Sequence, residues 1–178
     1  MKLDRIIVDR VRRYLTLGAF SAVLVLGAGY ALRAAPKAHW VVFKSNVLNL
    51  QVSVPSDWKP VKTPNALAFR YEGLDGAKAG IGILKSSQTS GTIESAAETE
   101  FTRAGHPSAW TRTAARVDGM RAVKIVGTDT ANASIKFVHY YIDAPQGMYL
   151  VQCQAPTDQW STYSPIFAAV LARVKFLQ

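Results

Sequence analysis

The stretch of sequence that decides the fold is 134-SIKFVHYYIDAPQGMYLVQCQA-155. It contains two runs rich in β-branched and aromatic residues, separated by a Pro-Gln-Gly turn at 145–147. In the second run, Tyr149, Val151 and Cys153 recur at every second position, the spacing at which side chains of a strand share one face. We expect an antiparallel hairpin here, because a loop this short cannot join parallel strands.

Outward from this hairpin, the same features recur along the chain. Two further runs precede it, 110-WTRTAARV-117 and 121-RAVKIVGT-128, separated by an Asp-Gly turn. Nearer the N-terminus, apolar residues alternate over 48–54, and the runs 67–71 and 79–86 flank a glycine-containing turn. Four successive strands joined by short turns predict an antiparallel meander, preceded by a separate hairpin.

One amphipathic helix is expected in the middle of the chain. Thr92 can cap its start, Ile93, Ala97 and Phe101 follow at helical spacing, and Gly105 ends it. The acidic residues expected on its exposed side are Glu94, Glu98 and Glu100. Exposure to solvent is sufficient to explain three acidic residues at these positions, so we assign them no functional role.

A second helix is expected over residues 158–174, near the C-terminus. Its apolar stripe consists of Trp160, Tyr163, Phe167, Val170, Leu171 and Val174. Pro165 lies inside this range, so we expect the regular helix to begin there, with Ser164 as its cap. Helices bury such stripes against the faces of a sheet, so the predicted fold class is α+β, with an antiparallel β-sheet flanked by helices.

The run 15-LTLGAFSAVLVLGAGYALRAAP-36 predicts a membrane-spanning helix. Nineteen consecutive residues from Tyr14 to Leu32 carry no charge. At ~1.5 Å per residue they extend roughly 28 Å, close to the ~30 Å hydrocarbon core of a bilayer. A cleavable export signal normally has a shorter apolar region of about 7–15 residues. Small residues on both sides of Tyr30 would suit cleavage, so a signal peptide is the alternative to a retained span.

Basic residues beside this run predict its orientation. Five of the 21 basic residues precede it, and these are Lys2, Arg5, Arg10, Arg12 and Arg13. Fewer follow it closely, which favours a cytoplasmic N-terminus, with the rest of the chain in the periplasm and the span in a bacterial inner membrane. The formal charge of +9 then favours contact with anionic lipid headgroups, and no nucleic-acid partner is expected.

Four parts of the chain follow from this interpretation: a cytoplasmic basic amphipathic segment at 1–13, a single transmembrane helix at 14–33, a linker at 34–39 and an extracytoplasmic domain at 40–178. One helical face of the span carries the small residues Gly18, Ser21, Ala22, Ala28 and Gly29. Such a face lets another helix approach closely, so we expect it to pack against an integral membrane protein complex. The alternative is that membrane helices are rich in alanine and glycine for no specific partner.

Residues that could carry chemistry are few and scattered. His39, His106 and His139 have no second histidine or carboxylate at the close spacing typical of zinc ligands. We expect His139 on the wetter face of its strand, and Cys153 as a small buried apolar residue without a neighbouring base. The sequence therefore predicts no metal site, no cofactor and no catalytic residues, and the protein is not expected to be an enzyme.

Four basic residues flank the predicted hairpin at 110–128, and these are Arg112, Arg116, Arg121 and Lys124. They form a candidate docking patch for an acidic partner or for lipid headgroups. The alternative is an ordinary exposed face of the sheet.

The soluble part of the chain resembles the PsbP-like family over residues 40–178. The resemblance rests on the order of the elements and on three stretches, 52-VSVPSDWKP-60, 149-YLVQCQAP-156 and 160-WSTYSPIFAAVLARVKFL-177. It implies an α-β-α sandwich that is usually exported and acts as a non-enzymatic accessory or assembly factor on a larger complex.

Two functions are consistent with these features. The first is a membrane-anchored accessory or structural subunit that docks on the outer side of a larger membrane protein complex, for which a photosynthetic or respiratory assembly is the candidate. The second is a membrane-tethered binding module that holds a small ligand or lipid between sheet and helix.

Overall fold

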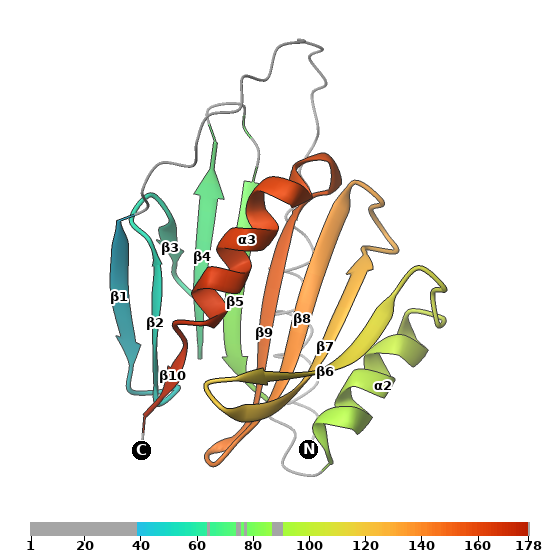
Figure 1. Cartoon of the computed structure of the whole chain (residues 1–178), viewed down its shortest axis with the longest axis horizontal. Helices are drawn as coiled ribbons and strands as arrows, with labels where there is room; N and C mark the ends of the chain where they lie inside the picture. The colour runs from blue at the N-terminus through green and yellow to red at the C-terminus, as the bar shows by residue number, and fades with distance from the viewer. Residues whose placement is uncertain (1–38, 64, 74–75, 77, 87–90, 178) are drawn as a thin grey trace, which may run out of the picture. The chain divides into compact units, whose positions relative to one another are not determined.

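The computed structural model describes residues 39–63, 65–73, 76, 78–86 and 91–177, which belong to one compact unit (Figure 1). The predicted basic segment at 1–13, the span at 14–33 and its small-residue face lie outside these residues. Within the part of the chain that the structure describes, no helix has the length and hydrophobicity needed to cross a membrane.

A seven-stranded antiparallel sheet forms the body of this unit. Its spatial order is β3 (Lys59–Val61), β4 (Ala66–Glu72), β5 (Lys78–Lys85), β9 (Gly147–Pro156), β8 (Ile135–Ala144), β7 (Met120–Thr128) and β6 (Thr111–Val117). Neighbours from β6 to β9 are consecutive in the chain, which confirms the expected meander. β4 and β5 form the separate hairpin that the sequence predicts.

A smaller antiparallel sheet has the order β1 (Trp40–Ser45), β2 (Leu50–Pro55) and β10 (Lys175–Phe176). The sequence predicts β2 but not β1, β3 or β10. β1 places two valines and a phenylalanine in succession, so it lacks the period of two, and β10 has only two residues. All three residues of β3 are exposed. Strands this short or this exposed carry no readable pattern.

The helix in the middle of the chain is α2 (Ile93–Arg103), and it begins as predicted. Thr92 accepts a hydrogen bond from the Ser95 N–H at 3.1 Å, while the Ser95 hydroxyl accepts one from the Thr92 N–H at 3.0 Å. This reciprocal capping satisfies two backbone donors at the start of the helix.

The predicted start of the C-terminal helix is wrong. α3 (Trp160–Leu171) follows a short 3-10 turn, η1 (Thr157–Gln159), and keeps Pro165 inside it, so Ser164 is not its cap. A proline in a helix removes one backbone hydrogen bond. Burial of Tyr163 and Phe167, which lie on either side of Pro165 in the sequence, stabilises the first turns in spite of that loss.

The two helices cover opposite faces of the large sheet. Side chains alternate along each strand, so Ile142 and Val151 face α3 and the smaller sheet, whereas Val123 and Ile125 face α2. Figure 1 shows α3 crossing the near face of the sheet and α2 beside β6 and β7. The result is the predicted antiparallel sheet flanked by helices, with the smaller sheet added on the α3 side.

A close contact on the α2 side involves Gly127 of β7. A Cβ atom at this position would overlap the ring of Trp110, whose Nε1–H donates to the Thr128 carbonyl at 2.8 Å. The Trp110 ring also packs edge-on against Phe137. By contrast, a Cβ at Gly82 of β5 would have no atom within 4 Å.

We predict that Gly127→Ala lowers the free energy of unfolding by about 1–3 kcal/mol, because the indole must move and its hydrogen bond is strained. Gly82→Ala is the matched strand control, with an expected change within about 0.5 kcal/mol. Urea unfolding of the full chain, followed by circular dichroism, measures both. Equal effects of the two substitutions would contradict this packing.

Candidate functional site

Three of the four residues in the predicted basic patch share one face of the sheet. Arg112 and Arg116 lie on β6 at alternate positions, and Arg116 stands directly opposite Arg121 on β7. Lys124 lies three residues after Arg121, so the alternation of the strand places it on the α3 side. The patch is therefore the three arginines alone. The expectation of four grouped residues is wrong for Lys124.

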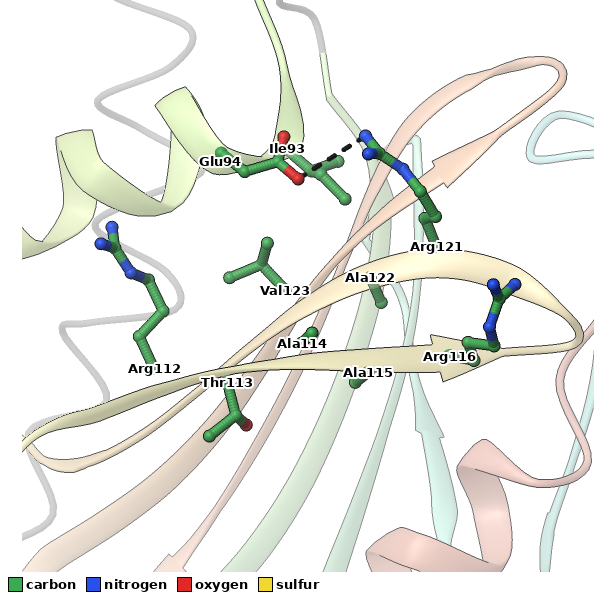
Figure 2. Close-up of a pocket in the computed structure, with 10 residues that line it drawn as sticks. All are labelled: Ile93, Glu94, Arg112, Thr113, Ala114, Ala115, Arg116, Arg121, Ala122 and Val123. Atoms are coloured by element: carbon green, nitrogen blue, oxygen red, sulfur yellow. Dashed lines mark ion pairs between the residues drawn. The ribbon is translucent and has the colours of Figure 1, made fainter.

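A groove lies between these arginines and the first turn of α2. It has a volume of about 510 Å³, within the range of roughly 300–1,000 Å³ that is common for binding sites. Its apolar floor consists of Ala114 and Val123 on the sheet, and Ile93 is the apolar residue of the wall that α2 forms. Figure 2 shows Arg112 and Arg121 directed toward α2. We call this hollow the arginine groove.

Ion pairs nearly balance the charge along its rim. Arg112 pairs with Glu98, and Arg121 lies 3.5 Å from carboxylate oxygens of both Glu94 and Asp143. All these side chains are exposed, so each pair contributes little to stability. Arg116 donates instead to the Gly119 carbonyl at 2.7 Å and has no carboxylate partner among the described residues. Its guanidinium is the one on this rim that can still pair with a carboxylate.

The strand that bears two of these arginines is an edge of the sheet. No described strand pairs with the outer side of β6. The tight turn at Asp118-Gly119 has positive φ at both positions and makes Val117 and Met120 its hydrogen-bonded ends. Hydrogen-bonded and non-hydrogen-bonded pairs then alternate along the hairpin. The backbone N–H and C=O groups of Arg112, Ala114 and Arg116 consequently point outward, away from β7.

The turn that joins β6 to β7 is tied to the C-terminal strand. Asp118 accepts hydrogen bonds from the Phe176 N–H at 2.9 Å and from Lys175 Nζ at 2.6 Å. Burial acts to raise the pKa of Asp118, but the hydrogen bonds from Lys175 and the Phe176 N–H outweigh it, so the pKa lies below its ordinary value. The carboxylate therefore holds the tip of the hairpin against β10.

A second polar cluster anchors α2 to β8. Glu100 Oε1 lies 2.7 Å from His139 Nδ1, and Glu100 Oε2 accepts a hydrogen bond from the Tyr141 hydroxyl at 2.9 Å. The Glu100 and His139 side chains are only 18% and 14% exposed. The expectation that Glu100 faces solvent is therefore wrong. His139 lies, as expected, on the more exposed face of β8, which also carries the exposed Asp143. Glu100 follows Ala97 by three residues, and this spacing places it at the border of the apolar stripe of the helix.

The remaining candidates for chemistry are spread out. The described residues contain no group of three histidine, cysteine or acidic side chains that could hold a metal ion. Cys153 is fully buried, as expected, and burial raises the pKa of its thiol well above the ordinary value. A thiol in this state stays protonated and serves as a small apolar side chain.

Comparisons with known proteins show the fold. No protein-family model and no curated protein sequence matches this chain. The solution structure of cyanobacterial PsbP (CyanoP) from Synechocystis sp. PCC 6803 is similar, with a TM-score of 0.52 and 14% identity, covering 85% of this chain and 98% of CyanoP. A similar crystal structure is LpqN, involved in cell envelope biogenesis of Mycobacterium tuberculosis, with a TM-score of 0.50, 13% identity, and coverage of 80% and 86%.

A third similar structure is PA94 from Pseudomonas aeruginosa, a protein of unknown function described as a putative regulator. Its TM-score is 0.50 at 12% identity, and the match covers 75% of this chain and 94% of PA94. At these identities the likeness concerns the fold alone. The described residues therefore have a PsbP-like fold, as the sequence resemblance implied.

Replacement of Asp118 tests the link between the hairpin and β10. We predict that Asp118→Asn, which tolerates the same positive φ, lowers the free energy of unfolding by about 1–2 kcal/mol at pH 7, because a charge-assisted hydrogen bond is lost. Asp143→Asn, at an exposed ion pair, is the control and should change it by less than about 0.5 kcal/mol. Urea titrations measure both values.

The pH dependence of this effect has a defined sign. A carboxylate with a lowered pKa stabilises the fold above its unfolded pKa of about 3.9, and the contribution is lost as the pH falls through the folded pKa. The difference between the original chain and Asp118→Asn should therefore shrink progressively below about pH 4. A difference that stays constant down to pH 2 would refute the role of the charge.

Proposed function

We propose that this protein is a non-catalytic accessory subunit that docks on the outer side of a larger membrane protein complex. In this proposal, the helix predicted at 14–33 anchors the chain, and the PsbP-like domain stands on the periplasmic side. The observation that supports it is the outer edge of β6, which runs along the arginine groove and has no pairing strand among the described residues.

A free strand edge next to a groove suits an extended protein segment. Such a segment can add a strand to a sheet, gaining main-chain hydrogen bonds from the outward N–H and C=O groups and specificity from pockets for alternate side chains. Three residues of β6 direct their backbone N–H and C=O groups outward. Ala114, between the two arginines, has a small side chain that does not cover the rest of the apolar floor. An apolar floor within a polar rim is also the usual arrangement of protein interfaces.

The chemistry of the groove defines the partner segment. An apolar side chain would contact Val123 and Ile93, and a carboxylate two positions away, on the same face of the segment, would pair with Arg116. The other two arginines already have acidic partners, so they favour a segment with few additional charges. In the same proposal, anionic lipid headgroups contact the basic residues that precede position 14.

The descriptions of two similar structures are consistent with this role. CyanoP is a cyanobacterial PsbP, and LpqN is involved in cell envelope biogenesis. Neither description concerns this chain, but both are consistent with an accessory function associated with membranes or the envelope. Support for the specific docking surface comes from β6 and its neighbours.

Co-purification from the native host tests the proposal. The tagged full-length chain is extracted in mild detergent and sized by gel filtration, and we expect it to elute with a larger complex. Ala114→Pro removes an outward N–H without removing a hydrogen bond to β7, and Arg116→Glu places a negative charge opposite the proposed carboxylate. Each should reduce the complex-bound fraction by about tenfold or more, which corresponds to ~1.4 kcal/mol.

Val61→Glu is the matched control. Val61 is exposed on β3, the strand at the opposite end of the seven-stranded sheet, so this variant should remain in the complex. All four proteins must unfold cooperatively at similar temperatures for the comparison to hold. The proposal fails if the original chain elutes alone, or if Val61→Glu releases the complex as strongly as Arg116→Glu.

A further inference from the structure

A second hollow lies on the opposite face of the sheet, along one side of α3. Val126 of β7 and Val138 of β8 stand directly opposite each other and form its floor. Trp160 and Phe167 of α3 form its wall, and Tyr140 of β8 also lines it. We call this hollow the α3 groove. Its lining is aromatic and aliphatic apart from one cation and the hydroxyls of Tyr140 and Ser164.

The cation in the α3 groove is Lys124. Its Nζ lies 5.9 Å from the centre of the Tyr140 ring. The Nζ of Lys136 lies 5.4 Å from the centre of the Trp160 ring, and Trp160 lines the groove. Neither lysine forms an ion pair with a carboxylate among the described residues. On the arginine rim, by contrast, two of the three cations are paired. The α3 groove therefore combines apolar walls with uncompensated positive charge.

The protonation state of Tyr140 decides whether it can compensate the charge of Lys124. Burial, with a smaller contribution from Cys153, raises the pKa of Tyr140 to about 12. Its hydroxyl is therefore neutral near pH 7 and provides no negative charge for Lys124. The site can accept an anion without first displacing an internal one.

The size of the α3 groove limits what it can hold. Its volume is about 190 Å³, the space of roughly six water molecules at ~30 Å³ each. This lies below the roughly 300–1,000 Å³ of pockets for drug-sized ligands. A lipid tail or a folded peptide is too large for this volume, whereas a ligand with one or two fused aromatic rings is small enough.

We propose that the α3 groove binds a small aromatic carboxylate, with its rings between Trp160 and the valine floor and its carboxylate on Lys124. Apolar burial supplies most of the affinity, and the lysine supplies the preference for an anion. This is a ligand site separate from the docking surface on β6, because the two lie on opposite faces of the sheet.

The probe for this site is 2-naphthoate, and its neutral counterpart is 2-naphthylmethanol. The full-length chain, labelled with ¹⁵N and held in mild detergent, is titrated while the indole N–H signals of its four tryptophans are recorded. Substitution of Trp160 by phenylalanine assigns its signal. Because the protein signal is observed, partition of the probe into detergent does not imitate binding.

We expect the Trp160 indole signal to shift in a saturable manner, with a dissociation constant on the order of 1 mM or lower for a ligand of about thirteen non-hydrogen atoms. Trp58 and Trp110 should not respond. Lys124→Met keeps the apolar stem of the side chain and should weaken naphthoate binding about tenfold or more. Lys44→Met, an exposed lysine on β1, is the matched control and should leave binding unchanged.

Blocking the groove gives an independent readout. Ala168 is exposed on α3 and lines the hollow, so Ala168→Phe should fill it and abolish the response to both probes while the fold is retained. The proposal is overturned if Trp160 does not respond to naphthoate. It is also overturned if Lys124→Met and Lys44→Met bind naphthoate equally, or if the alcohol binds as tightly as the acid.

Discussion

Side chains along a β-strand point alternately to the two faces of its sheet, and in this protein that alternation assigns the residues of the two proposed sites to opposite surfaces. Arg121 and Lys124 are close in sequence, yet one belongs to the arginine groove beside α2 and the other to the α3 groove. A shift of register by one residue would exchange the two surfaces and expose the core. Short turns such as Asp118-Gly119 fix the register of the strands they join. The hydrogen bonds of Asp118 to β10 hold this turn in place.

The arginine groove also depends on the position of α2. Ile93 and Glu94 belong to this helix, so one wall of the groove moves if the helix moves. The interaction of Glu100 with His139 and Tyr141 holds α2 against β8. Because the cluster is largely buried, loss of one member would remove a hydrogen bond from poorly solvated polar groups. On the opposite face, the buried Tyr149 hydroxyl donates to the Leu48 carbonyl at 2.6 Å and links β9 to the turn between β1 and β2. Each face thus has its own polar link through an otherwise apolar layer.

The sequence predicts most of this fold because its strands are long and its turns are short. The period of two and the Asp-Gly and Pro-Gln-Gly turns locate the meander, and Thr92 marks the start of α2. The short strands and the first turns of α3 could not be predicted, since they depend on tertiary contacts: β10 on pairing with Leu50 and Gln51, and α3 on burial of aromatic residues around a proline.

The candidate sites were only partly predictable for the same reason. Three arginines of the patch follow from the sequence, while the separation of Lys124 follows only when the strand register is known. The cluster on α2 and β8 joins Glu100 to residues about forty positions away, a relation that no local spacing contains. The charge balance on the groove rim, which leaves Arg116 available, likewise needs the folded arrangement of helix and hairpin.

The central claim is that the outer edge of β6 meets a partner protein while the opposite edge of the same sheet, at β3, does not. Site-specific photo-cross-linking in the intact host tests it most directly, with a photoreactive amino acid placed in turn at position 114 on β6 and at position 61 on β3. The account predicts a cross-link to one larger membrane protein from position 114 and at most a trace from position 61. Equal cross-linking from both positions, or none from position 114, would contradict it.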